Sequence, residues 1–380
     1  MLEKGCGLME FIPGLELCES FFHGAVWPLL KQQYPSLSFS AGVLGYGSDV
    51  LGFDDATSTD HMWGPRLYLF LDKSDLSLAH QLQELFAFKL PFTWQGYPVH
   101  FSKPDPLDQG IRQMEASDRY PIAPMIWIHS IEEYFISYLG TYLTQLSAPL
   151  DWLCVSEHRL LGATSGRIFH DDLGVSEVRA NLSFYPDDVR TYLLASQWSL
   201  IAEEQAFVTR TGTRGDEIGT RLITSRIAER LMRLHFLYER KYAPYSKWFG
   251  TSYAGLDDSK ELHRYLLAAL QASTWQDREE RLVRALLCVG QIHNDSQLTA
   301  PLELYEQDYF SRPIRVVRAE RFAQALHKQL HGSPLQSFPL IGSLSQIANF
   351  TTLYDDPKVG FLRQQRLYQS WIDSSQPEDE

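Results

Sequence analysis

The sequence GYGSDVLGFDDATSTDHMWGP, from Gly45 to Pro65, decides how the first half of this chain folds. Within it, eleven residues separate the pair Gly47 and Ser48 from Asp60. Glycine lets the backbone approach a ligand closely, and backbone amides in a turn can bind phosphate oxygens. The carboxylate of Asp60 is an oxygen ligand of the kind that Mg²⁺ prefers. The stretch predicts a phosphate-binding turn followed by a metal ligand, with an ordinary turn and a capping aspartate as the structural alternative.

Short apolar runs on both sides of this stretch indicate a small sheet. The patterns predict strands at residues 39–45, 66–71, 97–101 and 167–169. They predict a short helix or turn at 49–54 and helices at residues 15–34, 75–88 and 128–147. After Pro186, long helical patterns dominate. We therefore expect an α+β fold with a small mixed-sheet domain in residues 1–175, a helical domain in residues 176–373 and a disordered acidic tail in residues 374–380.

Composition restricts the class of protein. The 380 residues carry a formal net charge of −13, which argues against a general nucleic-acid coat protein because phosphate neutralisation needs clustered Lys and Arg. The four cysteines show no C-x-x-C spacing, so neither a zinc site nor a disulfide framework is indicated. The sequence shows no signal peptide and no apolar run of about 20 residues, so we expect a soluble cytoplasmic protein without a membrane partner.

Four stretches carry a more specific resemblance. They are GYGSDVLGFDD (residues 45–55), STDHMWGPR (58–66), RGDEIGTRL (214–222) and ERKYAPYSKWFGT (239–251). Over most of residues 10–300 the chain resembles a family classified as a domain of unknown function, within the nucleotidyltransferase superfamily of DNA polymerase beta and the aminoglycoside nucleotidyltransferases. The resemblance implies a nucleotidyltransferase-like N-terminal domain, a nucleoside triphosphate (NTP) substrate and a divalent metal, Mg²⁺ or Mn²⁺. It places Gly47 and Ser48 at the phosphate-binding turn and Asp60 as the first metal ligand.

Met62 is where the chain departs from the superfamily pattern, which has a second Asp or Glu at this position. A thioether is too soft and uncharged to replace a carboxylate on Mg²⁺. The third carboxylate normally lies on a later strand, and the predicted strand 97–101 offers His100 instead. Either His61 or His100 helps Asp60 to bind a softer ion such as Mn²⁺ or Zn²⁺, or the fold binds a nucleotide without transferring it. Three nearby aspartates could instead supply the missing carboxylate or be solvated turn residues: Asp49, Asp54 and Asp55.

Residues 210–247 are basic in an acidic chain. They include nine Lys or Arg against four Asp or Glu, a net charge of +5. Four arginines lie along one face of the predicted helix 217–241: Arg226, Arg230, Arg233 and Arg240. Such a run is usually a solvated face with helical ion pairs, but it also suits a polyanion. The overall charge therefore argues against a nucleic-acid partner, and if one binds, we expect it to bind to this segment.

Aromatic and acidic residues around that helix complete the predicted site. Two tyrosines and two lysines follow the helix: Lys241, Tyr242, Tyr245 and Lys247. The tyrosines could stack a base and the lysines could hold a triphosphate, as the helical domain does in related transferases. Alternatively, the segment forms a packed interdomain loop. Together with Arg226 and Arg230, these four residues form the predicted nucleotide-binding set of the helical domain. Glu203 and Glu204 are candidates for a general base that deprotonates an acceptor hydroxyl, although helical glutamates are mostly surface residues.

Three functions are consistent with these patterns. The first is a metal-dependent nucleotidyltransferase that moves a nucleoside monophosphate from an NTP to a hydroxyl of an unidentified acceptor. The second is a nucleotide-binding or interaction protein on the same fold, catalytically silent because its carboxylate set is incomplete. The third is an unrelated α/β protein that shares the glycine-serine turn by chance, and it predicts that Asp60 and His100 lie far apart.

Overall fold

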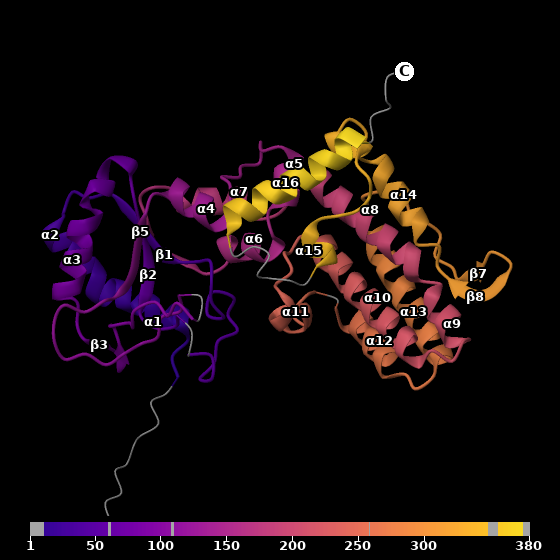
Figure 1. The fold of residues 1–380 in the computed structure, drawn as a ribbon, viewed down its shortest axis with the longest axis horizontal. Helices are drawn as coiled ribbons and strands as arrows, with labels where there is room; N and C mark the ends of the chain where they lie inside the picture. The colour runs from indigo at the N-terminus through magenta and orange to yellow at the C-terminus, as the bar shows by residue number, and fades with distance from the viewer. Residues whose placement is uncertain (1–10, 60–61, 108–109, 258, 349–355, 375–380) are drawn as a thin grey trace, which may run out of the picture. The chain divides into compact units, whose positions relative to one another are not determined.

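The computed structural model describes residues 11–59, 62–107, 110–257, 259–348 and 356–374 (Figure 1). It divides into two compact units. The sheet unit comprises Met1–Thr144 and Leu161–Ser183, and the helical unit comprises Gln145–Leu160 and Phe184–Glu380. The chain thus passes between the units three times, whereas the division expected from the sequence has a single boundary after residue 175.

A four-stranded mixed sheet forms the centre of the sheet unit. Its strands, in the order β5-β2-β1-β6, are Met125–His129, Arg66–Leu71, Phe39–Val43 and Arg167–Asp171. Strand β1 is antiparallel to both β2 and β6, and β2 is parallel to β5. With a helical unit following it, this small mixed sheet confirms the predicted α+β fold.

One face of the sheet carries the main hydrophobic core. Alternate strand residues point to this face and are buried: Phe39, Ala41 and Val43 of β1, and Leu67, Leu69 and Leu71 of β2. Helical segments cover them (Figure 1): α1 (Gly14–Phe21), a π-helical turn (Phe22–Val26), α2 (Trp27–Gln33) and α3 (Ala79–Lys89), which follows a 3₁₀ helix at Lys73–Leu78. Pro28 lies in the first turn of α2, directly after the π-helical turn.

Helix α4 (Ile131–Leu139) covers the opposite face. Ser130 and Glu133 form a capping box at its start, and Gly140, with φ of 91°, ends it. The helix predicted over residues 128–147 is therefore wrong in its first part, because residues 125–129 form strand β5. An apolar run this short fits a buried strand as well as a helix, and pairing with β2 decides between them.

The predicted strand 97–101 does not join the main sheet. Only Tyr97–Pro98 (β4) forms a ladder, in a two-stranded hairpin with Thr93–Trp94 (β3). The residues after the glycine-serine pair, predicted as a short helix or turn, form a turn in which the Phe53 N–H donates to the Ser48 carbonyl at 2.8 Å. The strand that pairs in parallel with β2 is β5 rather than residues 97–101.

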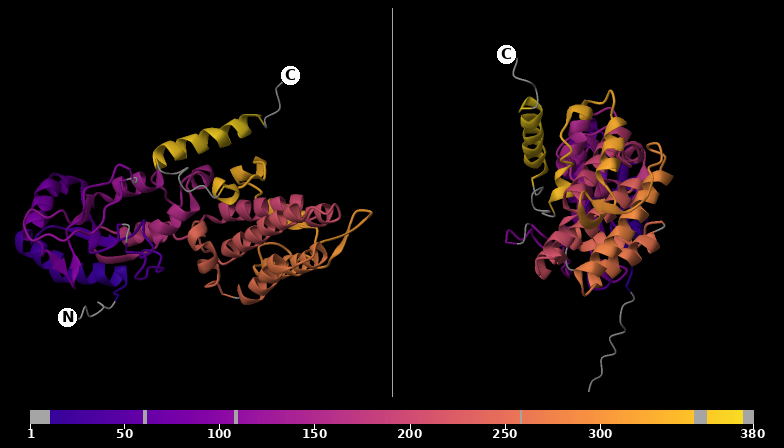
Figure 2. Two further views of the ribbon diagram at one scale, coloured as in Figure 1. Left: turned by 60° about the horizontal axis from the view of Figure 1, so that its bottom comes forward. Right: turned by 90° about the vertical axis from the view of Figure 1, so that its right-hand side faces the viewer.

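Helices and one hairpin build the helical unit. Its longer helices are α8 (Asp187–Glu204), α10 (Glu217–Tyr238), α12 (Ser259–Gln271), α13 (Trp275–Asp295) and α16 (Pro357–Ser374). Shorter ones are α5 (Pro149–Cys154), α9 (Phe207–Gly212), α11 (Ser246–Tyr253), α14 (Glu320–Lys328), a 3₁₀ helix at Pro334–Ser337 and α15 (Leu344–Ile347). Helix α6 (Glu157–Thr164) begins in this unit and ends in the sheet unit, which also contains α7 (Val175–Asn181). The hairpin of β7 (Gln307–Tyr309) and β8 (Arg312–Val316) projects from the helices (Figures 1 and 2).

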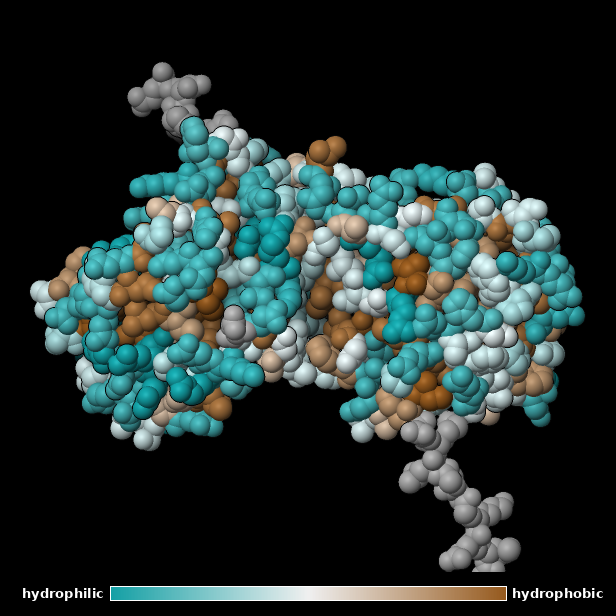
Figure 3. All heavy atoms as spheres, turned by 180° about the vertical axis from the view of Figure 1, so that it is seen from behind, coloured by the Kyte–Doolittle hydropathy of each residue, from teal (hydrophilic) through white to brown (hydrophobic). Residues whose placement is uncertain are grey.

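The surface is mixed in polarity. Figure 3 shows a face on which hydrophilic side chains surround separate hydrophobic areas. Within the described ranges, no helix is both long enough and apolar enough to cross a membrane.

Candidate nucleotide site

The turn after β1 depends on glycine at two positions. Gly45 and Gly47 have φ of 92° and 125°, in the left-handed region that favours glycine. A Cβ on Gly45 would lie 2.7 Å from the Tyr134 hydroxyl, and a Cβ on Gly47 would lie 2.0 Å from Asp49 Oδ1. The Gly45 N–H donates to the carbonyl of Gly162 on α6 at 2.9 Å. The turn is therefore held in one conformation by contacts that a side chain would obstruct.

An ion pair beneath the turn fixes it further. Arg66, the first residue of β2, donates to both carboxylate oxygens of Asp49 at 2.7 Å, and the two side chains are only 3% and 2% exposed. The same guanidinium nitrogen donates to the Tyr46 carbonyl at 3.1 Å. A buried carboxylate needs such a partner because isolated charge is costly away from water. Asp49 is thus committed to Arg66 and does not serve as the missing metal ligand.

The other two nearby aspartates also have structural roles. Asp54 accepts hydrogen bonds from the Gly14 N–H at 2.7 Å and from Trp63 Nε1 at 3.0 Å, which ties the start of α1 to the loop. Asp55 accepts from the hydroxyl and N–H of Thr57, and these bonds lower the pKa of its carboxyl group. One oxygen of each carboxylate is therefore engaged in holding the loop.

Asp60 and His61, the predicted metal ligands, lie outside the described residues. Met62, which follows them, has φ of 49° and donates its N–H to the Arg112 carbonyl at 3.1 Å. Met62 is therefore hydrogen-bonded to the segment around Arg112, whose side chain donates to the Ser102 carbonyl at 2.7 Å.

His100 lies beside this segment, but its ring is already engaged. Its Nδ1 accepts the Ala123 N–H at 2.8 Å, so a neutral ring carries its proton on Nε2. That Nε2 lies 3.8 Å from a carboxylate oxygen of Glu115. Neither nitrogen offers a lone pair to a cation in this arrangement, so metal binding by His100 would require breaking the bond from Ala123. Across the described ranges, no three His, Cys, Asp or Glu side chains are grouped in a way that could bind a metal ion.

The sheet face under α4 carries a row of aromatic rings. Trp127 and His129 of β5 pair in register with Tyr68 and Phe70 of β2. Ring contacts continue from Trp127 to Tyr68 at 4.8 Å, from Tyr68 to Tyr134 at 4.8 Å, from Tyr134 to Tyr138 at 5.7 Å and from Tyr138 to Tyr46 at 4.9 Å. Tyr46 belongs to the glycine turn. The sequence analysis did not identify this aromatic row, although Tyr134 and Tyr138 have the i,i+4 spacing of one helical face.

In the helical unit, the predicted phosphate-binding arginines are ion-paired. Glu204 accepts from Arg226 at 2.8 Å and from Arg230 at 2.5 Å. Glu204 is thus the partner of these two arginines, while Glu203 is exposed on the same helix. Of the nine basic residues in 210–247, six form ion pairs: Arg221, Arg226, Arg230, Arg233, Arg240 and Lys241. Of the two interpretations of this segment, a solvated face with ion pairs therefore fits most of these residues.

The aromatic segment after α10 is packed rather than open. Tyr242 is 4% exposed and its ring contacts those of Phe184 and Tyr185. Next to it, the Ala243 N–H donates to the buried carboxylate of Glu157 at 3.0 Å. Base stacking on Tyr242 would require this packing to open. Around it, Lys241 pairs with Asp257 at 3.4 Å, Tyr245 is half-buried, and the exposed Lys247 lies 4.9 Å above the Trp248 ring.

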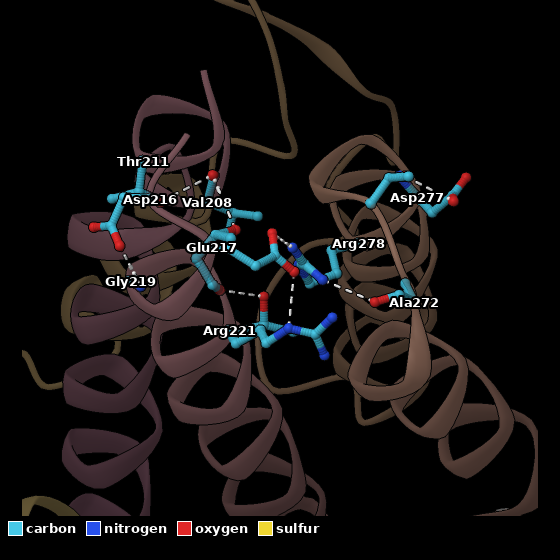
Figure 4. Close-up of polar contacts among 12 residues, drawn as sticks. Val208, Thr211, Asp216, Glu217, Gly219, Arg221, Ala272, Asp277 and Arg278 are labelled. Atoms are coloured by element: carbon cyan, nitrogen blue, oxygen red, sulfur yellow. Dashed lines mark hydrogen bonds and ion pairs between the residues drawn. The ribbon is translucent and has the colours of Figure 1, made fainter. Parts of the chain in front are cut away.

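The stretch RGDEIGTRL forms the start of α10 (Figure 4). Asp216 caps the helix by accepting the Gly219 N–H at 2.8 Å. Glu217 accepts from Arg221 at 2.8 Å and from Arg278 of α13 at 2.5 Å, while Arg278 also donates to the Ala272 carbonyl at 2.8 Å. These contacts connect α10 to α13 and give structural roles to three of the four charged residues of the stretch, Asp216, Glu217 and Arg221.

Comparison with known proteins gives a limited result. The family model described as a domain of unknown function, DUF4037, matches residues 152–249. This range includes RGDEIGTRL and most of ERKYAPYSKWFGT but not the stretch from Gly45 to Pro65. No curated protein matches the chain. Among solved structures, the chain is similar to a nucleotidyltransferase-like protein from Exiguobacterium sibiricum, with 11% sequence identity and a TM-score of 0.32, over 82% of this chain and 90% of that one.

Proposed function

We propose that the sheet unit binds a nucleoside triphosphate at the turn formed by residues 45–48, and that the protein acts as a nucleotide-binding protein without a conventional two-metal transfer site. One observation supports this most strongly. Among the described residues, the N–H groups of Gly47 and Ser48 and the Ser48 hydroxyl donate no hydrogen bond, and both residues are at least partly exposed. Consecutive backbone N–H groups of this kind form a concave anion site.

The charge around the turn is compatible with a phosphate. Asp49 is the nearest carboxylate in sequence, and its charge is neutralised by Arg66. Phosphate oxygens would therefore contact two backbone N–H groups and a hydroxyl. The ion pair beneath them has no net charge and does not repel the phosphate. The resemblance of the stretch to the superfamily's phosphate-binding turn supports the same residues.

The carboxylates needed for transfer are not assembled in the described residues. Two-metal transfer uses carboxylates that hold both ions while the leaving and attacking oxygens are stabilised. Asp49 and Asp54 are committed to Arg66, Trp63 and Gly14, and the parallel strand β5 carries Trp127 and His129. We infer binding rather than transfer from this ligand set, with Asp60 and His61 retained as a possible single-cation pair.

Nucleotidyl transfer to a hydroxyl acceptor is the second candidate, and Glu115 favours it. This carboxylate is 57% exposed and lies on the segment whose Arg112 carbonyl accepts the Met62 N–H. Its pairing with His100 Nε2, at 3.8 Å, is longer than the 2.7 Å pair of Asp49 with Arg66. Transfer would then require Asp60 and Glu115 together.

Titration calorimetry with ATP, GTP, CTP and UTP in the presence of Mg²⁺ or Mn²⁺ tests the proposal. Ser48→Ala removes one hydrogen bond to a charged group, so we expect the Kd to rise about tenfold. Ser77→Ala, at an exposed serine of the same unit, is the matched control and leaves the Kd unchanged. Absence of saturable binding by the wild type, or equal Kd values for wild type and Ser48→Ala, would contradict the proposal.

A pyrophosphate-release assay distinguishes the two candidates. The binding protein releases no pyrophosphate from any NTP with a panel of hydroxyl acceptors. Release that disappears in both Asp60→Asn and Glu115→Gln would establish transfer instead.

A further inference from the structure

We propose that Arg66 is a positioning residue of the nucleotide site that acts through the peptide bond between Tyr46 and Gly47, and that Asp49 limits phosphate affinity by neutralising Arg66. This role rests on the proposed function and names the charges that regulate the same site. Removing the charge of Asp49 should then make phosphate bind more tightly, even though the change breaks a buried ion pair.

The peptide bond between Tyr46 and Gly47 has a defined direction. Its carbonyl accepts from Arg66 Nη2 at 3.1 Å. Among the described residues the cis peptide bond is Tyr120-Pro121, so the bond from Tyr46 to Gly47 is trans. In a planar trans peptide the C=O and N–H groups point in opposite directions. The Gly47 N–H therefore points away from Arg66, and Gly47 itself is exposed to solvent.

Arg66 holds this peptide with the same nitrogen that binds Asp49. Nη2 donates to the Tyr46 carbonyl and to both carboxylate oxygens of Asp49, although a terminal guanidinium nitrogen has only a pair of hydrogens. Nε of the same guanidinium is buried and has no hydrogen-bond partner within the described ranges. Asp49 therefore competes directly with the Tyr46 carbonyl for the hydrogens of Nη2.

The ion pair packs directly against the inner side of the turn. A Cβ on Gly47 would lie 2.7 Å from Arg66 Nη2 and would overlap Asp49 Oδ1. Standard bond lengths and an N–H···O bond of about 2.9 Å put a phosphate oxygen bound to the Gly47 N–H within about 9 Å of Nη2. Over this distance a partly buried charge still acts on the phosphate, because solvent and salt screen it incompletely.

Asp49 opposes both contributions of Arg66 to the site. Its charge cancels that of the guanidinium, so the pair as a whole attracts phosphate little. Its oxygens also share the Nη2 hydrogens with the Tyr46 carbonyl. An asparagine amide could still accept from Nη2 but carries no charge. The guanidinium would then attract phosphate and bind the carbonyl more strongly, which polarises the peptide and makes the Gly47 N–H a better donor.

Titration calorimetry with ATP and with inorganic tripolyphosphate tests this role. Asp49→Asn should lower the Kd for both ligands by about three- to tenfold, while its Tm falls because a buried pair is broken. This gain in affinity should shrink when the salt concentration is raised from about 0.05 M to about 0.5 M. Glu132→Gln is the matched control, since it removes the same charge from the exposed pair with Lys73, beyond the other end of β2, and leaves both Kd values unchanged.

A double variant tests the hydrogen bond from Arg66. Arg66→Met with Asp49→Leu replaces the pair by apolar side chains, so the net charge is unchanged and no buried charge is left unpaired. The Tyr46 carbonyl loses its donor, and both Kd values should rise by about three- to tenfold, the effect of one hydrogen bond. The two substitutions at Asp49 thus move the Kd in opposite directions, which a purely structural role of the pair does not predict.

The outcomes separate this role from the proposed function. If Asp49→Asn weakens binding as its Tm falls, the pair acts only by stabilising the turn. If the double variant binds as tightly as the wild type, Arg66 does not position the peptide. In both cases weaker binding by Ser48→Ala leaves the proposed function standing, whereas a wild type that binds neither ligand shows both proposals to be wrong. Thermal melts establish which variants are folded, and if Asp49→Asn is not, the double variant decides.

Discussion

Removing a single oxygen from Tyr238 should destabilise the helical unit strongly. The Tyr238 hydroxyl lies between two buried groups: it accepts from Trp198 Nε1 at 2.8 Å and lies 2.9 Å from His293 Nδ1. The Thr299 hydroxyl donates to the Ala300 carbonyl at 2.9 Å, so it accepts from Nε2 of a neutral His293 at 2.8 Å. Nδ1 of His293 is then the acceptor for the Tyr238 hydroxyl proton. The hydrogen bonds from Trp198 through Tyr238 and His293 to Thr299 therefore all donate in the same direction.

The magnitude follows from burial. Trp198 is 0% exposed and His293 is 1% exposed, so water cannot replace a lost partner. Tyr238→Phe leaves one donor and one acceptor unsatisfied, each at a cost of about 1–3 kcal/mol. We expect a loss of about 2–4 kcal/mol, a large part of the roughly 5–15 kcal/mol that stabilises a typical domain.

Urea unfolding followed by tryptophan fluorescence and far-ultraviolet circular dichroism measures this loss. Tyr265→Phe is the matched control, since its hydroxyl makes an exposed hydrogen bond to Glu261 at 3.3 Å. This control should change the free energy of unfolding by less than about 0.5 kcal/mol. If Tyr238→Phe has an equally small effect, the hydroxyl does not satisfy the two buried groups and the reasoning is wrong.

Three further predictions concern pH, charge and close packing. Burial lowers the pKa of His293 from 6.5 to about 4, so its contribution is complete above pH 6.5 and is lost as the pH falls towards 4. The free energy of unfolding should fall between pH 7 and pH 4.5, and this fall should be about 2–3 kcal/mol smaller in His293→Gln than in the wild type. An equal fall in the two proteins would contradict this prediction. Arg66→Met leaves Asp49 unpaired and should cost about 3–5 kcal/mol in urea unfolding, whereas Arg66→Met with Asp49→Leu should recover most of it; no recovery would exclude the ion pair as the cause. Gly162→Ala places a Cβ 2.5 Å from the Gly45 carbonyl oxygen and should lower the Tm, while Gly250→Ala, with open space in α11, should not; similar Tm values would show that the turn tolerates displacement.

Parts of the fold were predictable from local pattern. The strand at residues 66–71 was predicted with its observed bounds, because an apolar run after Pro65 is closed by Asp72, which caps the next helix. Helix α10, predicted at residues 217–241 and observed at Glu217–Tyr238, also follows its prediction closely, since its buried residues recur at helical spacing. Strand β5 was not predicted, because a five-residue apolar run becomes a strand only through pairing with β2.

The candidate site shows the same limit. Sequence located the glycine-serine turn, since glycine in a left-handed conformation is a local requirement. It could not show that Asp49 pairs with Arg66, 17 residues later, or that Glu204 pairs with Arg226, 22 residues later. Which charges are neutralised depends on neighbours brought together by folding.

By itself, therefore, the sequence determined the positions of the turn and of most long helices. Only the tertiary structure decided which carboxylates were already committed, that Tyr242 is buried, and that Tyr46 is exposed beside the turn. The physical reason is that backbone preference acts over a few residues, whereas burial and ion pairing are properties of residues distant in sequence.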